Sequence, residues 1–270
     1  MRKITYLLTI VIISSCQKED AVGIPTYIKI DDIALIEDDA NSNITDAWVY
    51  VNDQLQGVYE LPATFPVIAE GIQNLRVKAG IKVNGIASSR LAYPFYNSYY
   101  EDITFSQNET KTISPFVSYL DSINFFLEDF EGTGVNIEIS AISDTILLTS
   151  SDGDNNFGIG VLSDSLFTFE IATDELIDLP QSGAPVFLEL DYKSNTQFLV
   201  GVYVNYPQSV IQKDLLWINP KQDWNKIYVN LTSTISEGIN ASSFKVFIGM
   251  KRDFLLEKNE LYFDNLKVVY

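Results

Sequence analysis

The sequence predicts an all-β protein made of two β-sandwich domains, on three observations. Short runs rich in Val, Ile, Tyr, Phe and Thr alternate with clusters of Gly, Pro, Asn and Asp along most of the chain, as in strands joined by turns. After the first 15 residues, no stretch of helical length repeats its apolar residues with a period of 3.6. The chain has 270 residues, of which 46% are hydrophobic, and this length suits two modest domains that each bury a core.

Residues 1–15 have the layout of an export signal with a helical apolar segment. Arg2 and Lys3 give a positive start, residues 4–13 are uncharged and almost wholly apolar, and the two serines that follow are small. A helix needs about 20 residues to cross the roughly 30 Å apolar core of a bilayer, so a permanent transmembrane helix is the weaker interpretation. We therefore expect the chain to be exported and this segment to be removed.

Cys16, the only cysteine of the chain, directly follows this segment. Residues 13–16, Ile-Ser-Ser-Cys, resemble the lipobox of bacterial lipoproteins, and residues 17–20, Gln-Lys-Glu-Asp, resemble the surface-export signal of Bacteroidota lipoproteins. The resemblance implies that Cys16 carries fatty acyl chains such as palmitate. It also implies that residues 16–24 tether the protein to the outer membrane, exposed at the cell surface. An ordinary signal peptide that happens to contain a cysteine is the alternative.

The charge and the missing residue types exclude several classes of function. Asp and Glu number 36 against 18 Lys and Arg, and the net charge of −18 disfavours binding to nucleic acid or to anionic lipid headgroups. The chain has no histidine, and its one cysteine is expected to be acylated. Ser-His-Asp and Cys-His catalysis and the usual zinc, haem and iron–sulfur sites are thereby excluded. Carboxylate chemistry and metals with oxygen ligands remain.

Residues 25–118 are predicted to form the first domain. The alternation Ala-Trp-Val-Tyr-Val-Asn over residues 47–52 is typical of a strand with one buried face, and residues 104–117 are expected to be the last strand of this domain. The size of the domain suits an immunoglobulin-like sandwich without a disulfide. With the Gly and Pro turn residues that follow it up to Gly71, the run at 47–52 resembles the PEGA-type β module of bacterial envelope proteins.

Residues 121–270 are predicted to form the second domain. Three segments, residues 126–131, 224–231 and 262–268, resemble in order and spacing the galactose-binding-type jelly roll, which is the fold of many carbohydrate-binding modules. The resemblance implies that the first and last strands lie side by side. It supports the fold more firmly than it supports sugar binding.

The same family often holds a structural calcium between acidic groups near those two strands. Carboxylate oxygens are the ligands that Ca²⁺ prefers. The candidate ligands by this resemblance are Glu128, Asp129, Glu131 and Asp264. Alternatively, these acids are solvated strand ends or hydrogen-bond partners of loop amides.

Aromatic side chains are candidates for ligand binding, since β-sandwich modules stack sugar rings on Trp or Tyr. The candidates are Tyr203, Tyr206, Trp217 and Trp224 in the second domain, and Tyr96 and Tyr99 in the first. Core packing is the competing explanation for any one of them. The aromatic cluster between Tyr93 and Tyr100, interrupted by Pro, Asn and Ser, could be exposed and contact a glycan or a protein partner, or it could fill the end of the first sandwich or the gap between the domains.

Three Asp-Ser/Thr-aliphatic triplets resemble the O-glycosylation site that Bacteroidota use outside the cytoplasm. The acceptors they imply are Ser122, Thr145 and Ser165.

The leading hypothesis is a non-catalytic surface lipoprotein that binds a glycan or an envelope protein. The second is a structural or adhesive part of an outer-membrane assembly without a small-molecule ligand. A carboxylate-dependent glycoside hydrolase is the third, although the chain lacks a Glu-x-Asp-x-x-Glu run of the kind that jelly-roll glucanases use, and no catalytic residue is proposed.

Overall fold

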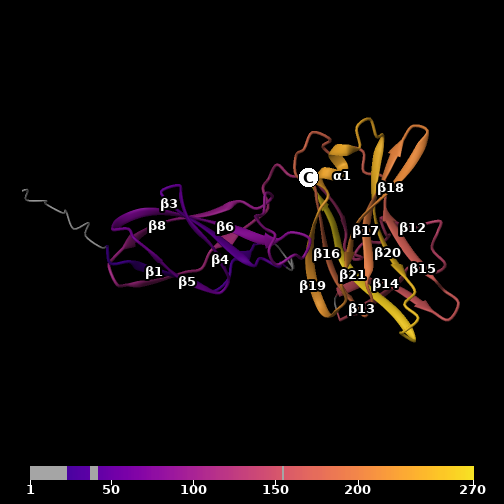
Figure 1. Ribbon diagram of the computed structural model, residues 1–270, viewed down its shortest axis with the longest axis horizontal. Coiled ribbons are helices and arrows are strands. Elements are labelled where there is room, and N and C mark those ends of the chain that lie inside the picture. The colour runs from indigo at the N-terminus through magenta and orange to yellow at the C-terminus, as the bar shows by residue number, and fades with distance from the viewer. Residues whose placement is uncertain (1–22, 37–41, 154) are drawn as a thin grey trace, which may run out of the picture.

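The protein consists of two β-domains arranged end to end (Figure 1). The computed structural model describes residues 23–36, 42–153 and 155–270. Over these residues the chain forms 21 strands and one six-residue helix, so the all-β prediction is confirmed. The predicted signal segment, Cys16 and most of the tether lie outside the described residues. Within the described ranges, no helix is both long enough and apolar enough to cross a membrane.

The first domain is a sandwich of short strands. One sheet has the order β4-β3-β6-β7, with β8 also paired to β6, and the facing strands form the sets β5-β1-β9 and β10-β2. Strand β1 is antiparallel to β5 and parallel to β9. The strands are β1 (Thr26–Ile30), β2 (Ala34–Leu35), β3 (Asp46–Val51), β4 (Gln54–Glu60), β5 (Ala63–Val67), β6 (Gly71–Lys82), β7 (Arg90–Ala92), β8 (Ser98–Phe105), β9 (Thr110–Ile113) and β10 (Phe116–Val117).

The alternation predicted for residues 47–52 is confirmed in β3. Ala47, Val49 and Val51 are buried and belong to one core with apolar residues of β1, β5 and β6, whereas the residues between them are partly exposed. The single strand expected over residues 104–117 is wrong, because β8 ends at Phe105 and a turn follows. Asn108 has a positive φ of 59° in that turn, which an extended strand does not allow.

The second domain packs two larger sheets against each other. One has the order β13-β14-β21-β16-β19, with β11 also paired to β21, and the other has the order β12-β15-β20-β17-β18. The strands are β11 (Phe125–Glu128), β12 (Ile137–Ile139), β13 (Leu148–Asp152), β14 (Asn155–Ser163), β15 (Thr168–Thr173), β16 (Phe187–Ser194), β17 (Phe198–Tyr206), β18 (Ser209–Ile218), β19 (Lys221–Asn230), β20 (Ser243–Lys251) and β21 (Lys258–Val269), and the helix is α1 (Thr232–Glu237).

The first and last strands of this domain lie side by side, as the jelly-roll resemblance implies. Strand β11 is antiparallel to β21, with Phe125 opposite Val269 and Glu128 opposite Leu266. Between the sheets the side chains of alternate residues form one core, to which β20 contributes Phe244, Val246 and Ile248.

The domains meet over the outer face of the first of these two sheets. Strands β16, β19 and β21 lie on the side of the second domain that faces the first (Figure 1). Phe187, Tyr228 and Val269 of these strands are buried in the core of the first domain. The amide of Asn84 donates to the Tyr228 carbonyl at 2.8 Å, and the Asn84 side chain accepts from the Asn230 amide at 2.9 Å. The turn after β6 therefore covers the open edge of β19.

Candidate functional site

Trp217 lies at the end of β18, and 46% of its surface is exposed. Strand β18 ends at Ile218 and β19 begins at Lys221, so Asn219 and Pro220 form the turn between them. Two hollows flank this turn, and Trp217 and Pro220 line both of them. A large exposed indole between two concave surfaces is unusual for a side chain that serves only packing.

The first hollow, called here the junction pocket, has a volume of about 540 Å³ and is lined by both domains. Its side chains include four amides, three lysines and the Trp217 indole. The first domain contributes Asn43, Thr45, Lys82, Asn84, Gly85, Ile86 and Ala87, and the second contributes Tyr192, residues 216–221 and residues 225–228.

Hydrogen bonds across the domain boundary fix the walls of the junction pocket. The side chain of Asn43 donates to the Lys226 carbonyl at 2.8 Å, and the Tyr228 hydroxyl accepts from the Asn43 amide at 3.4 Å. The Tyr192 hydroxyl donates to the carbonyl of Asn219 at 3.3 Å and thereby supports the turn. The pocket is therefore formed by the packing of the domains before any ligand binds.

The second hollow, called here the loop pocket, has a volume of about 500 Å³ and lies between the same turn and the loop after β20. The side chain of Gln197 donates to Asn219 Oδ1 at 2.8 Å. The other lining residues are Asn195, Thr196, Trp217, Pro220, Lys251, Arg252 and Asp253. Amide side chains both donate and accept hydrogen bonds, as sugar hydroxyls do, and an indole offers an apolar face to a sugar ring.

Trp224, another predicted binding residue, lies on the outer face of the other sheet and lines neither pocket. Its ring meets the edge of Phe157 with a centroid distance of 5.6 Å. Lys193 Nζ lies 5.2 Å from the Trp224 ring centre and 4.6 Å from that of Tyr262. Trp224 is 37% exposed, but Phe157 and Lys193 already contact its ring, so less of the ring is open to a ligand.

Tyr203 is packed on the outer face of the β17 sheet. Its hydroxyl donates to Glu170 Oε1 at 2.5 Å, and its ring lies 4.8 Å from that of Phe247, which is fully buried. Burial, followed by the hydrogen bond to Glu170, raises the pKa of Tyr203 to about 12. Tyr206, at the end of β17, is partly buried and packs against the main core of the domain.

Tyr93, Phe95 and Tyr96 of the aromatic cluster pack against Phe187 and Tyr228 of the second domain and fill the gap between the domains, which is one of the alternatives stated above. The hydroxyl of Tyr96 lies 3.2 Å from that of Tyr228, and Tyr96 is only 6% exposed. Burial raises the pKa of both Tyr93 and Tyr96 well above the ordinary tyrosine value. Neither ring leaves a free face for stacking against a sugar.

At the far end of this cluster Tyr100 is exposed, and Tyr99 is partly buried. Its hydroxyl donates to Glu101 Oε2 at 2.8 Å, and its ring meets the edge of Phe116. Desolvation and the hydrogen bond to Glu101 raise the pKa of Tyr99 to about 12. Tyr99 lines neither the junction pocket nor the loop pocket.

The carboxylates predicted to bind calcium accept hydrogen bonds from backbone and side-chain amides. Both oxygens of Glu128 accept backbone amides, from Phe130 at 2.8 Å and from Asn136 at 2.5 Å. Asp129 accepts the Glu131 amide, Glu131 accepts both the amide and the side chain of Asn156, and Asp264 accepts Asn155 and Asn265. The described part of the chain contains no group of three or more acidic side chains placed to hold a metal ion. As arranged, these carboxylates accept hydrogen bonds from loop amides, which is the alternative stated for them above.

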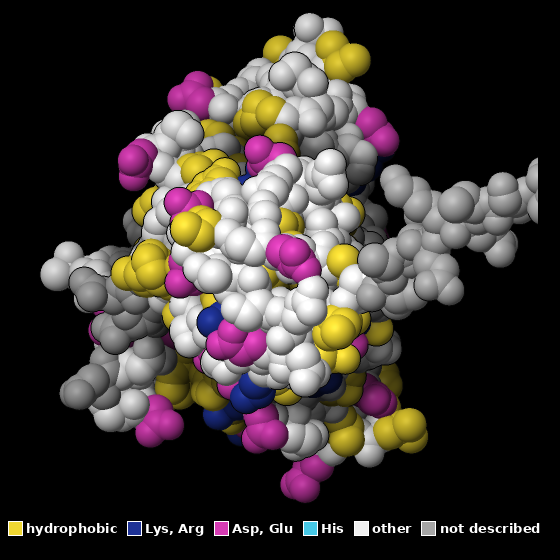
Figure 2. All heavy atoms as spheres, turned by 90° about the vertical axis from the view of Figure 1, so that its left-hand side faces the viewer, with side chains coloured by type: hydrophobic (Ala, Val, Ile, Leu, Met, Phe, Trp, Pro, Cys, Tyr) yellow, Lys and Arg dark blue, Asp and Glu magenta, His cyan; other side chains and the backbone are white. Residues whose placement is uncertain are grey.

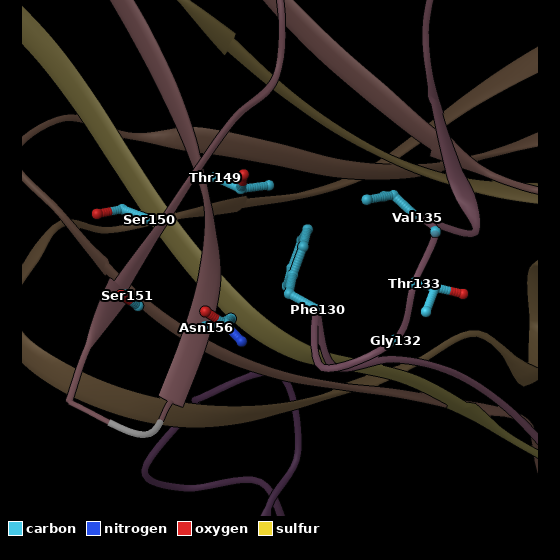
Figure 3. A pocket seen from close by; sticks show the side chains of 9 residues that line it. Phe130, Gly132, Thr133, Val135, Thr149, Ser150, Ser151 and Asn156 are labelled. Atoms are coloured by element: carbon cyan, nitrogen blue, oxygen red, sulfur yellow. The ribbon is translucent and has the colours of Figure 1, made fainter.

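A hollow of about 390 Å³ lies beside the same segment (Figure 3). Figure 3 shows the Phe130 ring between residues of β13 and the loop that carries Thr133 and Val135. Apart from Phe130, which is buried, its lining is small and mostly polar, including Thr149, Ser150 and Ser151. It offers neither a carboxylate nor an exposed aromatic platform.

The three predicted glycosylation acceptors lie in turns or loops. Ser122 and Ser165 are exposed, and Thr145 is partly exposed. Asp144, next to Thr145, accepts the amides of Phe167 and Thr168 at 3.0 Å, so its carboxylate is held by the backbone.

Several residues of the Trp217 site are missed by the sequence analysis. Asn43, Asn84, Asn219 and Gln197 are isolated amides in turns or at strand ends. Asn84 precedes a glycine, but that pair signals only a turn. No sequence motif links these four residues, because they are far apart in the chain and come together only when the two domains fold and pack.

The chain is similar to several solved structures, all at low identity. It matches a family 30 carbohydrate-binding module of a Clostridium thermocellum cellulosomal cellulase at 17% identity and a TM-score of 0.37, covering 53% of this chain and 90% of that one. It matches a family 11 carbohydrate-binding module from the same organism at 14% identity and a TM-score of 0.38, covering 55% and 95%. It matches the enzymatically active domain of bacteriophage CBA120 tailspike protein 4 at 10% identity and a TM-score of 0.41, covering 53% and 20%. No protein-family model and no curated protein matches the chain.

Proposed function

We propose that this protein is a non-catalytic glycan-binding module and that Trp217 is its stacking platform. The observation that carries the proposal is the place of this indole, 46% exposed between two pockets that are lined mainly by amides and other polar groups. A pyranose ring would stack on the indole, and its hydroxyls would exchange hydrogen bonds with Asn225 in the junction pocket and Gln197 in the loop pocket. Pockets open to solvent suit a chain segment of a polysaccharide better than a small buried ligand.

The proposal includes an anchor on the outer surface of the outer membrane. It rests on the lipobox-like sequence before Cys16 and the Gln-Lys-Glu-Asp segment after it. The described chain starts at the end of the first domain that lies away from the second domain (Figure 1). A lipid at Cys16 would then leave the second domain far from the membrane, with the first domain acting as a spacer.

The test is a glycan array probed with the protein that begins after Cys16. Wild-type protein should bind a defined set of saccharides, and Trp217→Ala should lose them. Trp224→Ala is the matched control, because it removes an indole of similar exposure that lines neither pocket, and it should bind like the wild type. Failure of the wild type to bind any saccharide would overturn the proposal and leave the structural or adhesive role.

A further inference from the structure

The junction pocket differs in charge from the rest of the protein. Its 18 lining residues include Lys82, Lys221 and Lys226 and no Asp or Glu. The whole chain, by contrast, has twice as many acidic as basic residues. Figure 2, which looks onto the first domain, shows Asp and Glu spread over that face and Lys and Arg gathered mainly in its lower half. With three lysines and no carboxylate in its lining, the junction pocket is therefore basic on a chain that is acidic as a whole.

The three lysines are not equally available to a ligand. Lys82 pairs with Glu60 at 3.1 Å, and Lys226 is buried and pairs with Glu189 at 3.3 Å. Lys221 is exposed and forms no ion pair with another described residue. It is therefore the cation of the junction pocket that a ligand can reach without breaking an existing pair.

The positive character continues around the β18–β19 turn. Lys221 also lines a smaller hollow of about 180 Å³ together with Lys193. Lys193 forms no ion pair with a described residue, and its Nζ lies over the rings of Trp224 and Tyr262. In the loop pocket, Arg252 donates to carbonyl and amide oxygens and not to a carboxylate. Two acids border these hollows, but Glu260 pairs with Lys258 at 2.7 Å and Asp253 accepts the Leu255 amide.

From this charge distribution we infer that the saccharide bound at Trp217 is anionic, carrying carboxylate or sulfate groups, and that Lys221 pairs with one of them. This inference rests on the proposed function, because it specifies which class of glycan Trp217 would bind. Ammonium groups form charge-assisted hydrogen bonds with carboxylate and sulfate oxygens, which a neutral sugar does not offer.

The net charge of −18 opposes such a ligand only at long range. At an ionic strength of 0.15 M, charges further apart than about 8 Å are largely screened. An anionic group in contact with Lys221 therefore responds to the lysines near it more than to the distant acidic surface. The positive charge of the lysines around the pocket therefore decides which glycan binds, whereas the negative charge of the whole protein only slows the association of an anionic glycan.

The test measures binding of the protein that begins after Cys16 to two matched pairs of polymers by isothermal titration calorimetry. Polygalacturonate is compared with its methyl ester, which removes the carboxylate charge, and carrageenan is compared with agarose, which lacks the sulfate. The anionic member of at least one pair should bind at least about tenfold more tightly than its neutral partner. Raising NaCl from 0.15 to 0.5 M should weaken only the binding of the anionic polymer.

Lys221→Gln should weaken binding of the anionic polymer by about three- to tenfold and leave binding of a neutral polymer unchanged. Lys213→Gln is the matched control, since Lys213 is an exposed lysine on β18 that lines none of these hollows, and it should bind like the wild type. Equal affinity for charged and neutral partners, or binding to neutral saccharides alone, would overturn the inference and leave the proposed function standing. Absence of binding to every polymer and every saccharide of the array would overturn both.

Discussion

Tyr93 of the first domain donates a hydrogen bond of 2.6 Å to Glu189 Oε1 of the second, at the centre of the contact between the domains. The other oxygen of Glu189 accepts the Tyr119 hydroxyl at 2.7 Å and pairs with Lys226 at 3.3 Å. Glu189 is fully buried, so its charge is balanced by these three donors. Lys226 also lines the junction pocket, and the network therefore holds one wall of the proposed binding site.

Replacing Glu189 should destabilise the protein strongly. In Glu189→Ala, Lys226 is left buried without its partner, which costs about 3–5 kcal/mol. Tyr93→Phe removes one hydrogen bond to the buried carboxylate and leaves the ion pair, so it should cost less, about 1.5–3 kcal/mol. Thermal unfolding followed by calorimetry should show a larger decrease in melting temperature for Glu189→Ala than for Tyr93→Phe. Equal, small decreases in the melting temperatures of the two variants would show that the Glu189 network contributes little to the stability of the protein.

Asp264 should make stability depend on pH. Burial raises the pKa of this carboxyl from 3.8 to about 6, although Asn155 and the Asn265 amide donate hydrogen bonds that act in the opposite direction. The folded protein thus holds this proton more tightly than the unfolded chain does. The contribution of Asp264 to stability is largest below pH 3.8 and is lost as the pH rises through about 6.

Asp264→Asn removes this titration and keeps a side chain that can accept a hydrogen bond. The melting temperature of the variant relative to wild type should therefore be higher at pH 7.5 than at pH 4. A difference between the two proteins that does not change with pH would mean that Asp264 titrates normally.

Calcium should have no effect on the second domain. Glu128 uses both oxygens for backbone amides, and the nearby acids are similarly engaged. The melting temperature should be the same in a chelator as in millimolar Ca²⁺, because an ion that binds only the folded state would raise it. A calcium-dependent increase would restore the site expected from the jelly-roll resemblance.

Strand alternation made much of the fold predictable. In β3 and β20 every second residue is apolar and buried in a core, because the side chains of a strand point alternately to opposite faces. The resemblance also placed β11 beside β21 correctly. The similarity of the first domain to PEGA-type modules and the lipid anchor stay predictions.

The site was less predictable, because it depends on contacts between distant segments. Trp217 and Trp224 are equivalent in the sequence, both in β-rich segments, yet one borders two pockets and the other packs beside Phe157 and Lys193. Phe187 is buried on the outer face of its sheet only because the first domain covers that face. A pattern along one strand cannot show what a second domain covers.

The most direct test of the central claim is a calorimetric titration of the wild type and of Trp217→Ala with the saccharide that binds best on the array. We expect Trp217→Ala to bind at least about tenfold more weakly while its melting temperature stays close to that of the wild type, since the stacking face is lost without a change in the core. Unchanged affinity in Trp217→Ala, with the same saccharide bound, would contradict the assignment of Trp217 as the stacking platform.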